Sequence, residues 1–381
     1  MAHTRLSLRN IDFILVTALL LICAVGLFSI KSATHNDLHP LDNFRKQTVG
    51  VGIGLILMMY VAASEYEQLL RRWVPYAYPI IVGVLLLLVL PKLGAHIAHS
   101  SHGAQRWINI GPIQLQPSEF TKLIIICSLS LYVTDHIETI GTWATLLKSF
   151  AHVGVPMLLI AKQPDLGTAL VLLAVWFGVV TVAGAKAKHL WILLGTGLML
   201  FGAIWQFGNV GPLHILKPYQ KQRLEVFLNP NSDTRDTGYH IKQSQIAIGG
   251  GELRGQGYMS GLQSNGKFIP EQHTDFIFTI IGEEGGFVAS CAVLVLFFIV
   301  LQRGLLAIVE CEDTLGRLLA GGIVSMLAFH TIVNTGMTLG IMPVVGVPLP
   351  CVSYGLSNLL VTMVSIGFLL SIGSRKLRLV F

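Results

Sequence analysis

FILVTALLLICAVGLFSI, the stretch at residues 13–30, contains no charged side chain. A helix needs about 17–25 predominantly apolar residues to cross the hydrocarbon core of a bilayer, and this run is long enough. It is too long for the apolar region of a typical secretory signal peptide, and no clean A-x-A cleavage site follows it. We therefore expect a retained first transmembrane helix.

The composition of the whole chain indicates an integral membrane protein. Of its 381 residues, 53% are hydrophobic and 12% are charged, whereas a soluble domain carries about 25% charged residues. Lys and Arg together number 26, against 20 Asp and Glu. Because no basic stripe is interleaved with aromatic residues, we expect no nucleic-acid partner and assign the basic excess to membrane topology.

The five cysteines follow no disulfide or metal-binding pattern. They lie in or beside apolar runs without CxxC spacing, so we expect small buried hydrophobic side chains, no disulfide framework and no metal site. These residues are Cys23, Cys127, Cys291, Cys311 and Cys351.

Ten apolar runs have the length of membrane-spanning helices. They are continuously apolar and longer than the strands of a membrane barrel, so we expect helices. The predicted fold class is an all-α polytopic membrane protein, with residues 1–381 forming a single integral membrane domain. The runs lie near residues 11–31, 47–63, 75–93, 117–134, 146–162, 166–185, 188–207, 276–302, 314–338 and 348–373.

The distribution of basic residues in the loops predicts the orientation. Placing the N-terminus inside puts most Lys and Arg in the cytoplasm, so we expect both termini there. A long external loop, about residues 208–274, then joins the seventh and eighth helices. Its aromatic and aliphatic content favours an ordered loop, and the amphipathic stretch from Tyr239 to Ile248 is expected to lie on the membrane surface.

The segment PEQHTDFIFTIIGEEGG, residues 270–286, concentrates charge where this loop enters the eighth helix. Asp275 then lies at the outer membrane face, where Thr274 or Asp275 can cap the helix and a carboxylate can also do chemistry. Glu283 and Glu284 are expected about two turns deeper, where carboxylates are costly unless they face the protein interior. A structural role with Arg or Ser/Thr partners is favoured over direct catalysis for these two glutamates.

Three further polar stretches interrupt the apolar sequence. In GAQRWINIGPIQLQPSEFTK, residues 103–122, Glu119 and Lys122 share a helix face and form either an exposed ion pair or a cavity-lining pair. Asp165 follows Pro164 and is suited to cap the sixth helix. The prolines and glycines of residues 342–358 break the helix at membrane depth, which requires protein burial or a wet cavity. These features suit either transport or chemistry on a membrane-borne substrate.

The motifs together resemble the SEDS family (shape, elongation, division and sporulation), and within it the RodA branch. The similarity runs in order over most of the chain, and the stretch GLQSNGKFIPE is closer to the elongation branch than to the division branch. Two positions depart from the family pattern, namely Gln272 and the stretch from Leu356 to Asn358. The matching stretches are GAQRWINIG, QPSEFTK, QPDLGTAL, KQRLEVFLNP, GYHIKQSQIAIGGGELRGQG, GLQSNGKFIPEQHTDFIF, EEGG and GIMPVVGVPLPCVSYG.

This resemblance implies a peptidoglycan glycosyltransferase that polymerises lipid II at the outer face of the bacterial cytoplasmic (inner) membrane during cell elongation. The family's essential aspartate corresponds to Asp275, which is suited to act as general base on the acceptor sugar. The polyprenyl diphosphate leaving group calls for cations, and membrane lipid surrounds the protein. The residues expected to bind substrate are Arg106, Glu119, Lys122, Asp165, Arg223, His273, Thr274 and Ser353.

The resemblance also implies partners and leaves alternatives open. The expected partner is a class B penicillin-binding protein, the transpeptidase, together with other elongation-complex proteins. The alternatives are a lipid II flippase or a scaffold that recruits the penicillin-binding protein. No cofactor is required by the motifs, and a divalent cation, Mg²⁺ or Mn²⁺, is left open.

Overall fold

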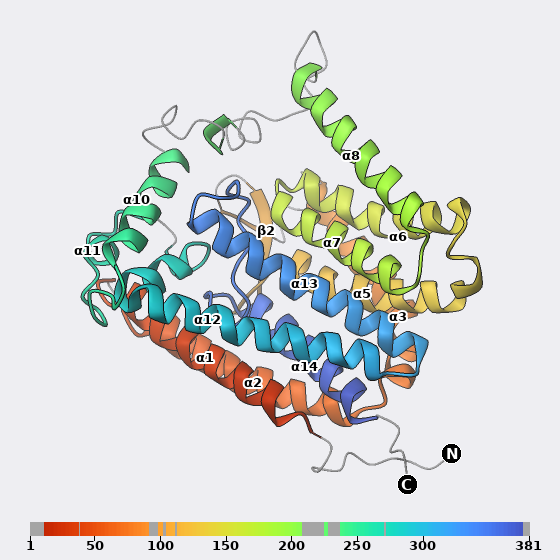
Figure 1. Ribbon diagram of the computed structural model, residues 1–381, viewed down its shortest axis with the longest axis horizontal. Helices are drawn as coiled ribbons and strands as arrows, with labels where there is room; N and C mark the ends of the chain where they lie inside the picture. Colours follow the sequence, from red (N-terminus) through yellow and green to blue (C-terminus); the bar gives the residue numbers. More distant parts are fainter. Residues whose placement is uncertain are drawn as a thin grey trace.

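The computed structural model describes residues 11–37, 39–90, 98–101, 104–110, 113–207, 225–227, 237–269 and 272–375. Ten helices in this part of the chain match the ten predicted spans (Figure 1). They are α1 (Phe13–Ala33), α2 (Asp42–Ala63), α3 (Tyr66–Val89), α5 (Pro117–Asp135), α6 (Trp143–Lys162), α7 (Leu166–Val182), α8 (Ala187–Phe207), α12 (Ile277–Glu310), α13 (Thr314–Thr338) and α14 (Leu356–Ser374).

The predicted all-α membrane fold is confirmed. Among the described residues, seven of these helices are long and apolar enough to cross a membrane, and α7 is a shorter apolar helix. The described ends of the chain lie on one side, because Asp12 pairs with Arg303 late in α12 and Arg375 donates to the Ser64 carbonyl after α2. Which side faces the cytoplasm stays a prediction.

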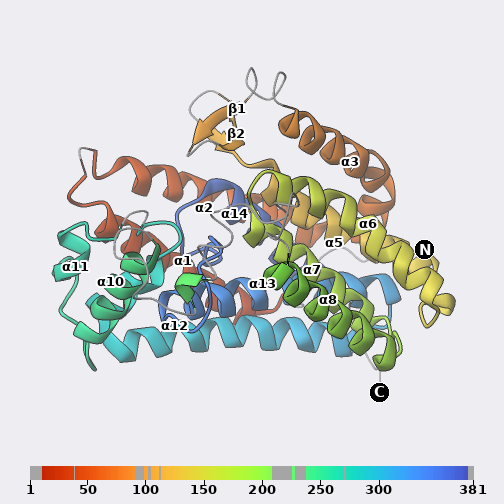
Figure 2. The same ribbon diagram turned by 90° about the horizontal axis from the view of Figure 1, so that it is seen from above.

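Smaller elements complete the described chain. The strands form a three-stranded antiparallel sheet that the search for spans did not identify, at the edge of the molecule in Figure 2 and next to α3. The amphipathic stretch from Tyr239 to Ile248 lies in helix α10, which packs against α12, and its placement on the membrane surface stays a prediction. These elements are β1 (Ala98–Ser101), β2 (Ala104–Ile110), β3 (Ile113–Leu115), η2 (Ile137–Thr139), α10 (Thr237–Gly250) and α11 (Leu262–Asn265).

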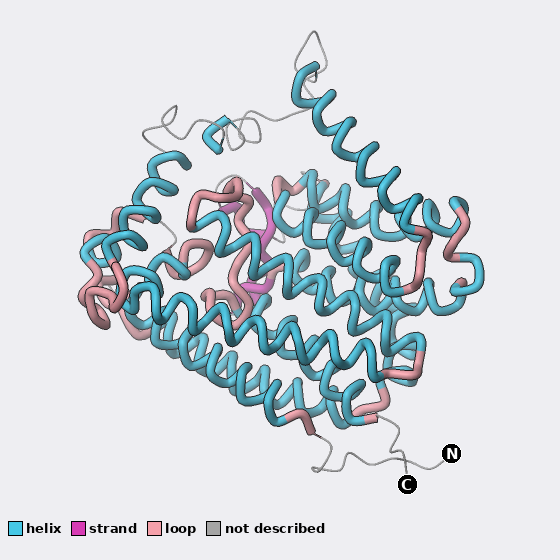
Figure 3. Tube along the Cα trace, viewed as in Figure 1, coloured by secondary structure: helices cyan, strands magenta, loops and turns pink. Residues whose placement is uncertain are grey.

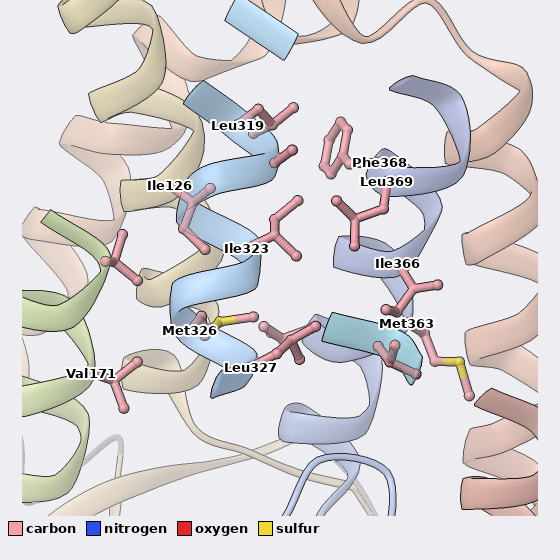
Figure 4. Close-up of a cluster of buried hydrophobic side chains, with 14 of the residues drawn as sticks. Ile126, Val171, Leu319, Ile323, Met326, Leu327, Met363, Ile366, Phe368 and Leu369 are labelled. Carbon is pink, nitrogen blue, oxygen red and sulfur yellow. The ribbon is translucent and has the colours of Figure 1, made fainter. Parts of the chain in front are cut away.

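Helix α13 lies at the centre of the apolar core. It packs against α5, α7, α12 and α14, whereas α8 extends away from the other helices in Figure 1. Its apolar side chains fill the space between α5 and α7 on one side and α14 on the other, so few of them are left to face lipid (Figure 4). The residues labelled there are Ile126, Val171, Leu319, Ile323, Met326, Leu327, Met363, Ile366, Phe368 and Leu369.

One predicted helix start and one predicted helix cap are wrong. Helix α14 begins at Leu356 and not at residue 348, because Pro348 and Pro350 cannot donate backbone hydrogen bonds and residues 343–355 are not helical. Helix α12 begins at Ile277 with Phe276 in the N-cap position, so neither Thr274 nor Asp275 is its N-cap residue. Asp275 therefore belongs to the segment that precedes the helix.

Helix α12 is broken at Gly286, whose φ of 66° leaves the right-handed helical region. The glycine-rich segment 251–257 lies in the break and binds the backbone groups that the helix leaves without partners. Four hydrogen bonds join Gln256 N to Glu283 O (2.9 Å), Gly257 N to Glu284 O (3.1 Å), Phe287 N to Glu252 O (2.9 Å) and Val288 N to Leu253 O (3.2 Å). The break is thus closed by backbone pairing with the loop.

Glu283 and Glu284 have the serine partners expected for a structural role. The Glu283 carboxylate accepts hydrogen bonds from the backbone N–H of Gln263 (2.6 Å) and of Ser264 (3.0 Å), at the start of α11, and also from the Ser264 hydroxyl. Glu284 accepts from the hydroxyl of Ser32, one residue before α1 ends. Both glutamates lie between the start of α12 at Ile277 and the break at Gly286, and their depth in the membrane stays a prediction.

Candidate active site

The segment 343–355 joins α13 to α14 as a non-helical loop among the helices (Figure 3), and we call it the re-entrant loop. Non-helical backbone among membrane helices must be satisfied inside the protein. Gln47 of α2 donates to the Ser353 carbonyl (3.2 Å) and accepts from Gly355 N–H (3.3 Å). On the other side, Gly167 of α7 has no side chain, which lets the Val345 carbonyl approach to 2.7 Å from where a Cβ would stand.

The backbone around Asp275 is fixed at three consecutive carbonyl groups. The donors come from the re-entrant loop and from α13, which are distant from Asp275 in the sequence. Tyr354 N donates to His273 O (2.8 Å), Ser353 Oγ to Thr274 O (2.6 Å) and Asn334 Nδ2 to Asp275 O (2.9 Å). This arrangement leaves little freedom to the main chain that carries the carboxylate.

The carboxylate of Asp275 lies against Gly346 of the re-entrant loop. Asp275 is half-buried, and its Oδ2 atom is 3.3 Å from where a Cβ on Gly346 would stand. Gly346 also has a φ of 72°, a conformation that favours glycine. Both the backbone conformation and the limited space next to Asp275 therefore favour glycine at this position.

Glu119 and Lys122 form the pair that their spacing predicts, and the pair is buried. The Lys122 Nζ atom lies 2.8 Å from Glu119 Oε2, and the two side chains are 1% and 6% exposed. The contact is a close ion pair and not an aligned hydrogen bond. The alternative of an exposed surface pair is thereby excluded.

Two side chains of α13 connect this pair to the re-entrant loop, and the sequence analysis missed both. His330 contacts Lys122 Nζ through Nε2 (3.0 Å) and the Pro348 carbonyl through Nδ1 (2.9 Å). Asn334, one turn later, donates to Val347 O (2.8 Å) as well as to Asp275. A histidine and an asparagine at i and i+4 in an apolar span mark a functional face, and that spacing was the available indication.

Asp165 caps α7 as predicted and also binds the start of α5. Its buried carboxylate accepts four hydrogen bonds, so its charge is compensated within the protein. The donors are Thr168 N (3.1 Å), Thr168 Oγ1 (2.9 Å), Ser118 Oγ (3.1 Å) and Gln116 Nε2 (3.2 Å). Asp165 thus holds together the two helix starts that flank the buried ion pair and the re-entrant loop.

Of the remaining residues predicted to bind substrate, Ser353 and His273 have described contacts, whereas the side chains of Arg106 and Arg223 are not described. The Ser353 hydroxyl donates its proton to Thr274 O and accepts from Leu349 N (2.8 Å), and the His273 ring lies 5.6 Å from that of Tyr354. Arg106 belongs to β2, but its side chain lies outside the description. Arg223 also lies outside the described residues.

The structure shows the contacts of Gln272 and Ser357, two residues at which the sequence departs from the family pattern. Gln272 is buried and donates to the carbonyls of Ala33 (2.9 Å) and Ser264 (3.2 Å), which ties the segment before Asp275 to the end of α1. Ser357 accepts from the backbone N–H of Gln116 (3.0 Å), just before α5. Both side chains make structural contacts around the site.

A metal ion is not provided for by the described side chains. Within the described ranges, no group of three or more His, Cys, Asp or Glu residues is placed to hold one. We therefore derive no step through a metal.

Comparisons with known proteins agree on one family. The family described as cell cycle proteins, FtsW, RodA and SpoVE, matches residues 9–377. The peptidoglycan glycosyltransferase MrdB of Escherichia coli K12 is 36% identical over 370 residues, which cover 94% of this chain and 93% of MrdB. The peptidoglycan glycosyltransferase RodA of Treponema pallidum is 32% identical over 442 residues, covering 97% of this chain and 99% of that protein.

Solved structures show the same fold. A chain from a peptidoglycan synthase complex superposes with a TM-score of 0.75 at 29% identity, covering 96% of this chain and 98% of the other. The rod shape determining protein RodA of Thermus thermophilus gives 0.67 at 26% identity, with 97% and 98% covered. The chain belongs to the SEDS family of peptidoglycan glycosyltransferases, and it is a multi-pass membrane protein.

Proposed function

We propose that this protein polymerises lipid II into glycan strands at the outer face of the bacterial inner membrane, with Asp275 as the general base. The observation that carries the proposal is the fixation of the Asp275 main chain at three carbonyl groups around a half-buried carboxylate. A catalytic group must be held by its surroundings in one geometry to be effective. The main chain of Asp275 meets that requirement. Serine and backbone donors bind the carboxylates of Glu283 and Glu284, which supports a structural role for these two residues.

The proposed step is a glycosyl transfer between two lipid-linked sugars. The Asp275 carboxylate takes the proton from the C4 hydroxyl of the acceptor sugar as this oxygen attacks the anomeric carbon of the donor. The bond from that carbon to the diphosphate oxygen breaks, and polyprenyl diphosphate leaves with the bonding electrons. The proton is later released from Asp275 to water.

The leaving diphosphate needs positive charge, and Lys122 is the described cation that we assign to it. Its Nζ atom lies 2.8 Å from Glu119 Oε2 and 3.0 Å from His330 Nε2, and it has no further partner among the described residues. A cation in a poorly hydrated site stabilises a developing anion more strongly than one in water. Arg106 and Arg223 are proposed as further cations, and His273 and Thr274 as contacts for the sugars. Ser353 and Asp165 are proposed to act by holding the loop and the helix starts.

The test is polymerisation of lipid II by purified protein, followed by gel separation of the glycan strands. We expect the wild-type protein to make strands and Asp275→Asn to make none, because removal of a general base lowers the rate by about 10²–10⁴-fold. Because Phe276 occupies the N-cap position, the loss cannot be attributed to a missing helix cap. Wild-type protein that makes no strands but moves labelled lipid II across liposomes would establish the flippase instead.

We further propose that the protein acts in cell elongation with a class B penicillin-binding protein. The structure at TM-score 0.75 comes from a peptidoglycan synthase complex, which supports such a partnership. SpoVE of Bacillus subtilis is 34% identical, close to the RodA relatives, so the elongation branch rests on the stretch GLQSNGKFIPE. Depletion of this protein should make the cells round and not filamentous, and its renewed expression should restore their shape.

The proposed orientation places both termini in the cytoplasm and residues 208–274 outside. Ser260 is exposed in the described part of this loop and is therefore suited to carry a reporter. In a background without other reactive thiols, Ser260→Cys should react with an impermeant maleimide in intact cells. If labelling requires permeabilised cells, the orientation is the reverse of the proposed one, and Asp275 lies on the wrong side of the membrane for lipid II.

A further inference from the structure

The contacts of His330 determine its protonation state. Its Nδ1 atom lies 2.9 Å from the Pro348 carbonyl, which only accepts, so Nδ1 carries a proton. Its Nε2 atom lies 3.0 Å from the Lys122 ammonium, which only donates, so Nε2 carries a lone pair. His330 is therefore neutral, in its Nδ1–H tautomer.

The surroundings stabilise this neutral state. His330 is 2% exposed and lies beside a lysine that is 1% exposed. Adding a proton would place two cations 3.0 Å apart away from water, which is strongly unfavourable. With Glu119 negative, Lys122 positive and His330 neutral, the three side chains have no net charge.

His330 and Asn334 bind adjacent carbonyl groups of the re-entrant loop. His330 binds the carbonyl of Pro348, and Asn334 binds that of Val347 and that of Asp275. One short piece of loop is thus connected through α13 to the proposed general base and to the buried cation. The position of Lys122 relative to Asp275 depends on these contacts.

We propose that His330 is a positioning residue for this glycosyltransferase, which holds the Lys122 ammonium and the Pro348 carbonyl in a fixed relation. The inference rests on the proposed function, because Lys122 is assigned there to the leaving diphosphate. His330 itself touches neither substrate nor reacting atoms. It acts through Lys122, by orienting the remaining N–H of the ammonium.

The test compares His330→Leu with His330→Gln. Leucine removes both polar atoms, whereas glutamine keeps an acceptor for Lys122 and a donor for Pro348. We expect His330→Leu to lower kcat by about 10–100-fold, the usual effect of losing a partner that orients a functional group, with KM for lipid II nearly unchanged. We expect His330→Gln to recover most of this loss.

His152 of α6 provides a matched control. It is a partly buried histidine whose Nε2 lies 2.9 Å from the Ser128 hydroxyl, and it contacts neither the ion pair nor the re-entrant loop. His152→Leu should keep kcat even if the thermal midpoint falls. Unchanged kcat in His330→Leu would overturn the proposal. A loss that glutamine does not recover, and that His152→Leu shares, would reduce His330 to a stabilising residue and also overturn it.

A spectroscopic measurement tests the inference independently of activity. Nitrogen-15 NMR of histidine-labelled protein, assigned by the signal missing in His330→Gln, should show a neutral ring protonated at Nδ1. In Lys122→Met the Nε2 resonance should shift, because its donor is gone. A protonated ring, or no shift in Lys122→Met, would overturn the inference while leaving Asp275 and polymerisation unaffected. Conversely, wild-type protein that makes no strands would refute the proposed function, and with it the role of His330.

Discussion

Two non-helical segments lie among the helices of this protein, and they are held in different ways. Segment 251–257 closes the break in α12 with backbone hydrogen bonds alone, and it depends on glycines that allow close approach. The re-entrant loop is held mainly by polar side chains, among them Asn334, His330 and Gln47. The carboxylates of Glu283 and Glu284, beside the first segment, accept hydrogen bonds from serine hydroxyl groups, whereas the second segment lies against the half-buried Asp275. Backbone hydrogen bonds thus hold the segment with a structural role, whereas side-chain hydrogen bonds, which substitutions can change, hold the loop beside the proposed active site.

The largest effect is expected for the buried ion pair beside the re-entrant loop. Lys122→Met should abolish strand synthesis and cost about 3–5 kcal/mol of unfolding free energy, because it leaves the Glu119 charge buried without a partner. Lys267, which pairs with Asp37 at 2.7 Å and is 49% exposed, is the matched control. Lys267→Met should cost less than about 1 kcal/mol. Equal losses of unfolding free energy in the two variants, measured on detergent-solubilised protein, would mean that burial does not make one ion pair more important for stability than the other.

Substitutions in segment 251–257, which pairs with the break in α12, should lower the free energy of unfolding. A Cβ on Gly255 would overlap the Glu284 carbonyl oxygen, and Gly255 has a φ of 80°. Gly257 has a φ of 101°, but its Cβ would meet nothing closer than 3.7 Å. Both alanine variants should lose about 1–3 kcal/mol for the backbone conformation, and Gly255→Ala a further 1–3 kcal/mol, roughly, for the overlap. If the thermal midpoints of the two variants coincide, the contact between Gly255 and Glu284 is less close than the structure indicates.

Substitution of Gly346 should lower kcat, and this is the smallest of the three expected effects. Gly346→Ala combines a φ of 72° with a Cβ 3.3 Å from the Asp275 carboxylate, whereas Gly184 has a φ of 79° and nothing within 4 Å. Both alanine variants should lose similar stability, about 1–3 kcal/mol. Only Gly346→Ala should lower kcat, by about tenfold, which corresponds to about 1.4 kcal/mol. Equal kcat values would show that the carboxylate tolerates a neighbouring methyl group.

The spans were predictable because a long apolar run has few stable alternatives in a bilayer. The break at Gly286 was not predictable, because a glycine pair in an apolar run also fits close helix packing, and the residues that pair across the break are 27 or 35 positions apart in the sequence. The Glu119–Lys122 contact was predictable from its i, i+3 spacing. The fixation of Asp275 depends on Asn334, 59 residues away, and local spacing carries no information about such a contact.

The closure of α12 by segment 251–257 has a consequence for building chimeras between relatives. The loop that precedes α12 is not a module that can be exchanged by itself, since its main chain completes the hydrogen bonding of this helix. An exchange that carries residues 251–257 without residues 283–288 would join two halves of one backbone interface that came from different proteins. Because the pairing is main chain to main chain, side chains there are free to diverge between relatives while the glycines are retained. Crossover points should therefore keep these two segments in the same parent.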